Sequence, residues 1–114
     1  MIKDYHAKGW HCISRQNYVC GLCGGTIDPH TVDGIFYDNI KREKLDLCHD
    51  FPRTKLNQKN YPLFIDSVEN LAVGHNSCNV RRIPLNYRDG VYNPKGFITF
   101  YQADQWEIKM RSEK

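Results

Sequence analysis

Residues 70–79 read NLAVGHNSCN, and this stretch decides the fold because it joins a short apolar segment to two metal-binding residue types. Asn70 to Val73 fits a short strand, and Asn76 to Ile83 fits a two-turn helix. His75 and Cys78 lie three positions apart at the start of that helix, so their side chains share one face. The stretch therefore predicts a strand, a pair of metal ligands and a helix in direct succession.

A second pair of candidate ligands precedes this stretch. Residues 20–25 read CGLCGG, in which glycines beside Cys20 and Cys23 allow the backbone to turn tightly around an ion. Three thiolates and one imidazole form a closed tetrahedral shell, and their softness favours zinc over magnesium or calcium. We therefore predict one structural zinc ion, held by Cys20, Cys23, His75 and Cys78. The alternative is that these are ordinary buried cysteines and an unrelated histidine.

Between the two pairs, residues 45–51 read LDLCHDF and alternate well enough for a short strand. Its two faces are expected to carry Leu45, Leu47 and His49 on one side, and Asp46, Cys48 and Asp50 on the other. Pro52 ends this strand because it lacks a backbone donor.

The rest of the chain is less regular. A short helix ending near Tyr18 is expected, residues 26–34 are rich in turn formers, and residues 53–62 form a polar, basic connection with little structure of their own. Residues 97–111 fit either a strand followed by a helix or one helix.

Length and composition favour a small α+β protein with a single domain over residues 1–114. With 40% hydrophobic residues the core is thin, and a metal staple helps such a chain. Five cysteines are an odd number, which argues against a complete disulfide framework and favours the cytoplasm. No apolar run reaches the ~20 residues of a membrane span, and MIKDYHAKGW has no apolar signal segment.

The order of these motifs resembles the HNH endonucleases. The matching elements are His49 with Pro52, Asn70-Leu71 and Cys78-Asn79, enclosed by the two ligand pairs. Zinc-stapled members of that family usually carry two Cys-x-x-Cys pairs, and here His75 begins the second. The resemblance covers about residues 18–83 and leaves residues 84–114 as an extension. It implies a ββα-metal (His-Me finger) domain that hydrolyses phosphodiester bonds in DNA.

The resemblance also implies a role for each motif residue. His49 is the expected general base, because an imidazole with an ordinary pKa of ~6.5 accepts a proton from water at neutral pH. Asn79 is the expected ligand of one catalytic Mg²⁺ or Mn²⁺ ion, which binds a phosphate oxygen and the leaving oxygen. Asn70 is the expected brace, whose amide bonds backbone across the loop and orients His49.

Cys48 is a departure from the family pattern, which usually has an acidic residue or histidine directly before the catalytic histidine. A thiolate is a poor ligand for magnesium. Three interpretations remain open: Asn79 is the main protein ligand, Asp46 or Asp50 supplies the carboxylate, or the site is degenerate and the protein only binds DNA.

The net charge of +3 is compatible with a nucleic-acid partner without demonstrating one. Candidate phosphate contacts lie near the motif, at Arg53, Lys55, Arg81, Arg82 and Arg88. The aromatic residues near the C-terminal end are expected to pack in the core rather than to stack on bases: Tyr87, Tyr92, Phe100, Tyr101 and Trp106.

Two other function classes remain as alternatives. One is a non-catalytic zinc module that binds nucleic acid or protein, and the other is an inhibitor that borrows the fold. For the enzyme we expect DNA as partner, no membrane contact, a monomer or homodimer, and a bacterial or phage-infected cell as the setting. Cys12 is expected to be a buried or free thiol, and His6 and His30 to be surface residues.

Overall fold

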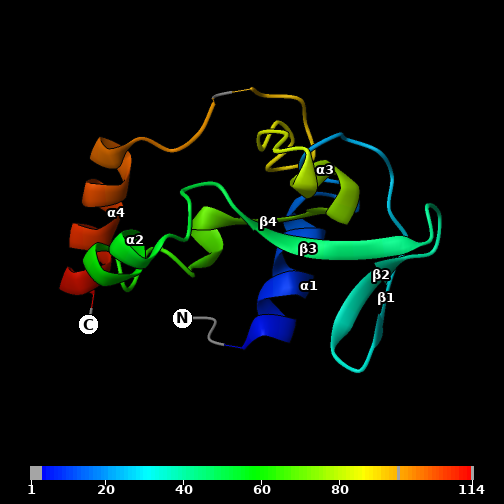
Figure 1. Cartoon of the computed structure of the whole chain (residues 1–114), viewed down its shortest axis with the longest axis horizontal. Helices are drawn as coiled ribbons and strands as arrows, with labels where there is room; N and C mark the ends of the chain where they lie inside the picture. The colour runs from blue at the N-terminus through cyan, green and yellow to red at the C-terminus, as the bar shows by residue number, and fades with distance from the viewer. Residues whose placement is uncertain (1–3, 95, 114) are drawn as a thin grey trace.

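The computed structural model describes residues 4–94 and 96–113. Figure 1 shows an antiparallel sheet with helices packed around it. The elements in chain order are α1 (Tyr5–Arg15), β1 (Pro29–Val32), β2 (Ile35–Asp38), β3 (Glu43–His49), α2 (Lys55–Asn60), the 3₁₀ turn η1 (Val68–Asn70), β4 (Leu71–His75), α3 (Asn76–Val80) and α4 (Phe100–Ser112). The α+β prediction is confirmed.

The four strands follow the order β1-β2-β3-β4, and each pairs antiparallel with the next. The β3–β4 pair sets the positions of the candidate site residues. Leu45 pairs with His75 at one end of this hairpin, and His49 pairs with Leu71 at the other. Because α3 begins directly after His75, the helix lies beside the end of the hairpin that is remote from His49.

The larger hydrophobic core joins α1, the turn after it, β2, β3 and β4. It contains Cys12, Ile13, Leu22, Phe36, Leu45, Cys48, Leu71, Val73 and Leu85. Gly9 of α1 allows this packing, because a Cβ there would lie only 2.4 Å from the Phe36 ring. The helix and the sheet thus approach each other closely below the hairpin (Figure 1).

A second, smaller core lies between α4 and the segment that links β3 to β4. Phe51, Tyr61, Phe64 and Ile65 pack there against Ala103 and Met110 of α4. In Figure 1 this region forms a separate group on the left, where α2 lies beside α4. Glu107 joins the two parts, because its buried carboxylate accepts hydrogen bonds from the amides of Leu63 and Phe64 at 3.0 and 2.9 Å.

Several expectations from the sequence were close to the observed elements. The expected strand over 45–51 runs from Glu43 to His49, and the expected strand from Asn70 begins at Leu71. The helix expected over 76–83 ends at Val80, since Arg82 adopts φ +57° and leaves the helical conformation. Residues 97–111 contain one helix, which begins after Thr99 with a capping box to Gln102.

Two expectations were wrong, and one was incomplete. Residues 26–34 contain the expected turn, at Asp33 and Gly34 with φ +52° and +79°, but this turn joins two short strands into a hairpin over residues 29–38. Residues 55–60 form a helix, since the Thr54 hydroxyl accepts a hydrogen bond from the Asn57 amide and caps its start. Finally, three of the aromatic residues expected in the core are mostly exposed: Tyr92, Phe100 and Tyr101.

Among the described residues, the structure has no helix that is long and apolar enough to span a membrane.

Candidate functional site

The four predicted zinc ligands come together from three separate elements. Cys20 and Cys23 lie in the turn after α1, His75 is the last residue of β4, and Cys78 lies in α3. Their ligand atoms all lie within 4.8 Å of one another. A zinc ion at ~2.3 Å from sulfur sets neighbouring ligand atoms ~3.8 Å apart in a tetrahedron. The observed 3.7 Å between Cys23 Sγ and His75 Nδ1 already matches that spacing, so these residues fit a tetrahedral metal ion.

Backbone amides surround the sulfur atoms. Cys20 Sγ accepts hydrogen bonds from the amides of Leu22, Cys23 and His75 at 3.3 to 3.5 Å, and Cys23 Sγ accepts one from Gly25 at 3.4 Å. Such donors stabilise thiolates, which are the form that binds zinc. The turn is therefore shaped for sulfur anions.

The thiols differ in how readily they ionise. Burial raises the pKa of Cys20, and burial together with the neighbouring Cys20 charge raises the pKa of Cys78 to about 11. For Cys23 burial acts in the same direction, but the Gly25 amide and the His75 side chain outweigh it and lower the pKa to about 7. The Gly25 amide and the His75 side chain therefore favour the thiolate form of Cys23.

Asp38 orients the histidine ligand, and sequence reasoning missed it. His75 Nε2 lies 2.7 Å from Asp38 Oδ2, and both side chains are fully buried. This contact leaves Nδ1 facing the three sulfur atoms. Burial acts to raise the Asp38 pKa, but hydrogen bonds from Asp28, His75, Ile40 and Lys41 outweigh it, so that the pKa is lowered. A carboxylate behind a metal-ligating histidine fixes its tautomer and strengthens binding.

His49 occupies the other end of the hairpin and also has a carboxylate partner. Its Nε2 lies 2.9 Å from Asp66 Oδ1, and the same oxygen accepts a hydrogen bond from Arg53 Nε at 2.9 Å. Burial acts to raise the Asp66 pKa, but the bonds from Arg53 and His49 outweigh it and the pKa is lowered. His49 lines a cavity of about 380 Å³ together with Tyr5 and Lys8 of α1.

Asn70 makes the backbone contacts expected of a brace. Its Oδ1 accepts a hydrogen bond from the Phe51 amide at 2.6 Å, and its Nδ2 donates to the carbonyls of Phe51 and Ile65 at 3.1 and 2.9 Å. The side chain is fully buried. Asn70 thus holds the chain directly after His49 against the chain that leads into β4.

Asn79 is exposed on α3 and contacts Asp46 rather than His49. Its Nδ2 lies 3.1 Å from Asp46 Oδ2, which also accepts a hydrogen bond from Asn76 at 2.9 Å. Asp46 precedes His49 by three residues on β3, a separation of ~10 Å along a strand. No hydrogen bond joins the His49 and Asn79 groups in the described part of the chain, and a common cleft for them stays a prediction.

Cys48 and Asp50, the two residues that flank His49, both have their side chains buried away from Asn79. Cys48 is buried in the core beside Gly74, and burial raises its pKa strongly. Asp50 is also buried and forms an ion pair with Arg88, whose Nη2 lies 2.6 Å from Asp50 Oδ2. Of the carboxylates considered from the sequence, Asp46 is therefore the one that lies beside Asn79.

The candidate phosphate contacts are dispersed. Arg81 and Arg82 are exposed after α3, and Lys55 is exposed at the start of α2. Arg88 is engaged with Asp50 and with the Glu69 carbonyl, while Arg53 is engaged with Asp66. Among these residues, Arg53 is the one in direct contact with the partner of His49.

Comparisons with known proteins gave no match, whether with family models, with curated proteins or with solved structures. The functional assignment therefore depends on the residues themselves.

The structure also places the remaining residues considered from the sequence. Cys12 is buried and points at the Leu71 carbonyl, 3.6 Å away. His6 accepts a hydrogen bond from Trp10 at 2.9 Å and stacks on Phe36, so it has partners that the sequence did not indicate. Asp66 could not have been found from the sequence motif, because it lies 17 positions after His49, beyond helix α2.

Proposed function

We propose that this protein is a metal-dependent DNA endonuclease of the HNH type, in which β3, β4 and α3 form the ββα-metal unit and the cysteine–histidine cluster holds a structural zinc ion. The observation that carries the proposal is the Asn70 brace beside His49. Three hydrogen bonds fix the backbone that follows the histidine, which is the role that the resemblance implies for this asparagine.

His49 acts as the general base in this proposal. Because Nε2 is held by Asp66, Nδ1 is the nitrogen that accepts a proton from the attacking water. Asp66 stabilises the imidazolium that forms, as a carboxylate does for other catalytic histidines. The hydroxide attacks phosphorus, the bond to the 3′ oxygen breaks, and that oxygen takes a proton from solvent, so that the products carry a 5′-phosphate and a 3′-hydroxyl.

Arg53 supplies positive charge next to this base. Its side chain is about half exposed, so it can exchange Asp66 for a phosphate oxygen without being drawn from a buried site. A guanidinium binds phosphate in a two-pronged manner. We assign Arg53 to the substrate phosphate, with Lys55, Arg81 and Arg82 as outer, salt-sensitive contacts.

Asp46 and Asn79 are the proposed protein ligands of Mg²⁺ or Mn²⁺. A carboxylate and an amide oxygen are hard donors of the kind these ions prefer. Asn79 presents its amide nitrogen to Asp46 in the structure, so cation binding requires its amide to flip. When bound, the ion supplies charge stabilisation for the phosphate and the leaving oxygen.

The decisive experiment is cleavage of plasmid DNA with MgCl₂ or MnCl₂ by the wild type and by His49→Ala. General-base catalysis is worth ~10²- to 10⁴-fold, so the variant should lose at least ~100-fold in rate while it keeps its zinc and its melting temperature. His30→Ala is the matched control, because this histidine is exposed on β1. Equal rates for the wild type and His49→Ala would refute the assignment of the base.

The second candidate is a non-catalytic zinc module that binds nucleic acid or protein. Two observations favour it: Cys48 replaces the usual acidic residue and is buried, and His49 and Asn79 bond to different carboxylates. A non-catalytic zinc module of the nucleic-acid-binding kind would bind DNA in a salt-dependent manner. Neither the wild type nor His49→Ala would then cleave DNA with Mg²⁺ or Mn²⁺. An inhibitor that borrows the fold would lack that DNA binding.

A further inference from the structure

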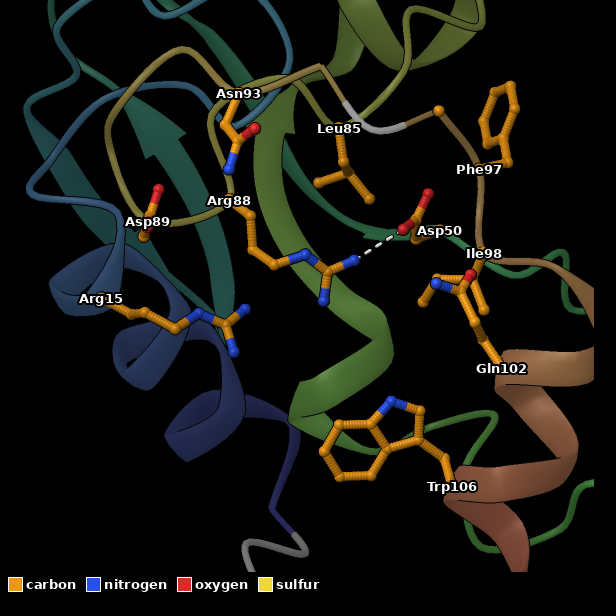
Figure 2. Close-up of a pocket in the computed structure, with 11 residues that line it drawn as sticks. Arg15, Asp50, Leu85, Arg88, Asp89, Asn93, Phe97, Ile98, Gln102 and Trp106 are labelled. Carbon is orange, nitrogen blue, oxygen red and sulfur yellow. Dashed lines mark hydrogen bonds and ion pairs between the residues drawn. The ribbon is translucent and has the colours of Figure 1, made fainter.

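A cavity of about 300 Å³ lies on the other side of the loop that follows His49. Figure 2 shows that its walls come from α1, the residue after β3, the segment that begins at Leu85, and α4. The polar residues that matter here are Asp50, Arg88, Arg15, Gln102 and Trp106. The cavity is separate from the one that His49 lines.

The charged residues of this cavity form an incomplete network. Asp50 is 3% exposed, its Oδ2 accepts a hydrogen bond from Arg88, and the Ile98 amide also faces its carboxylate. Arg15 donates through both terminal nitrogens to the carbonyls of Val68 and Leu71. Asp50 Oδ1 and Arg15 Nε are the two buried side-chain polar atoms without a hydrogen-bond partner in the described part of the chain. One acceptor and one donor are thus left unused on residues of the same cavity, and burial of such unpaired groups is unfavourable unless a ligand supplies a partner.

α4 contributes further donors. The Trp106 ring stacks on the Phe64 ring, with their centroids 6.2 Å apart. Figure 2 shows the Trp106 ring nitrogen turned toward Arg88 and Asp50. The Gln102 carbonyl oxygen accepts the capping hydrogen bond from Thr99, which leaves its NH₂ group as a donor. The cavity therefore offers several donors, with Asp50 as its buried carboxylate acceptor.

The balance of charge identifies the class of ligand. Among the described lining residues, the two arginines are balanced by Asp50 and Asp89, and this balance favours a neutral ligand over a phosphate group. A neutral planar heterocycle with acceptors on one edge and N–H donors on the next fits such a site. Guanine has O6 and N7 as acceptors, the edge that arginine most often reads, and N1–H and N2–H as adjacent donors for a carboxylate.

The cavity is connected to the candidate catalytic loop by direct bonds. Asp50 follows His49 in the chain, and its amide donates to the Asn70 carbonyl at 2.9 Å. Arg88 donates to the carbonyl of Glu69, the residue before Asn70. A ligand held by Asp50 and Arg88 is therefore placed next to the loop that carries His49.

We propose that this cavity binds one unstacked guanine base of the DNA substrate, with Asp50 accepting from its N1–H and N2–H edge and the arginine and indole donors facing O6 and N7. Asp50 Oδ1 is the acceptor available to the ligand without loss of the Arg88 contact, and Arg15 stays bonded to the Val68 and Leu71 carbonyls. The inference rests on the proposed function in one respect, namely that the ligand belongs to DNA.

Binding of single-stranded nonamers to the full chain tests this proposal without cleavage, in buffer that contains no added magnesium or manganese. The probes are thymidine nonamers with a central dG, with a central dT, or with a central abasic position, and guanosine 5′-monophosphate. The indole N–H signals of Trp10 and Trp106 are followed by NMR and assigned with Trp106→Phe. We expect the dG nonamer to shift Trp106 and not Trp10, and to bind at least 5-fold tighter than the other nonamers.

Two variants locate the contact. Asp50→Asn should remove most of the preference for dG, whereas Asp33→Asn, in the exposed β1–β2 turn, should leave it unchanged. If Asp50→Asn is unfolded by its melting curve, Trp106→Phe serves instead, because it keeps an aromatic ring and removes the N–H donor, and it should weaken dG binding.

The proposal is overturned if the dG and dT nonamers bind equally, or if Trp106 does not respond. It is also overturned if the free nucleotide binds as tightly as the dG nonamer, since the ligand is then a nucleotide and not DNA. Cleavage that depends on His49 with no preference for dG refutes the guanine cavity alone. A preference for dG without any cleavage supports the cavity and refutes the nuclease.

Discussion

The two ends of the β3–β4 hairpin carry a histidine–carboxylate pair each, and the pairs differ in exposure. At one end, His75 and Asp38 are fully buried and Asp38 is surrounded by donors. At the other end, the side chains of His49 and Asp66 are 23% and 43% exposed and line an open cavity. The buried pair, His75 and Asp38, is thus suited to a structural role, because water is excluded from it. The exposed pair, His49 and Asp66, is accessible to water and to a substrate.

Loss of a ligand at the buried end should have the largest effect. Cys20→Ser removes a predicted zinc ligand that also accepts three backbone hydrogen bonds. Structural zinc contributes on the order of 10 kcal/mol to folding, so we expect no bound zinc and no cooperative thermal transition. Zinc content and near-UV circular dichroism measure this. Cys12→Ala is the control, because Cys12 is an equally buried thiol outside the cluster, and it should retain one zinc ion per chain.

Loss of the Asn70 brace, at the exposed end of the hairpin, should have the second largest effect on stability. Asn70→Ala removes three buried hydrogen bonds and leaves backbone groups unpaired, at a cost of about 3 kcal/mol. Urea denaturation gives the free energy of unfolding. Asn39→Ala removes a single exposed side-chain bond to Asp28 Oδ2 and should change the free energy of unfolding by less than ~0.5 kcal/mol. An equal loss in both variants would show that Asn70 is no brace.

Asp38→Asn should weaken zinc binding without abolishing it. Loss of the carboxylate behind a ligating histidine typically reduces metal affinity ~10- to 100-fold. Competition with a chelating dye measures the affinity. Asp28→Asn changes an exposed neighbour and should leave it unchanged, so equal affinities for all three proteins would exclude an orienting role for Asp38.

Asp66→Asn should have the smallest effect on stability, below ~1 kcal/mol at pH 7, because the pair is partly exposed. The folded-state pKa of Asp66 is lowered, so its contribution is present above the ordinary carboxyl pKa of ~3.9 and disappears as pH falls through the lowered value. Unfolding measured from pH 7 downward should show the difference between variant and wild type shrinking below pH ~4. A difference that grows with acidity would contradict this sign.

The sequence predicted what is local and left open what is assembled over long distances. Cys20, Cys23, His75 and Cys78 were found because each pair lies within one turn, and ligand chemistry then requires the pairs to meet. Asn70 was found through the resemblance alone. Asp38 was missed because it reaches His75 only through pairing of β2 with β3 and of β3 with β4, which no local pattern reveals.

The position of Cys48 shows the same limit. Alternation correctly placed it on the strand face opposite His49, but the sequence did not show that this face is covered by Leu22 and the cysteine turn. The position that is usually acidic in the family is therefore a core position in this protein, occupied by Cys48. Asp46 lies beside Asn79 instead, a choice that the sequence left open between Asp46 and Asp50.

The position of His75 between β4 and α3 has a consequence for how the chain reaches its native state. All four ligands can bind one zinc ion only after residues 24–74 have formed a closed loop and β4 has paired with β3. The reason is that His75 is the last residue of β4 and Cys78 lies in α3, the helix that follows. Closing so long a loop is slow compared with forming a local turn. Capture of a metal ion by all four ligands is therefore expected late in folding, because a chain that ends before residue 75 contains only Cys20 and Cys23 of the set.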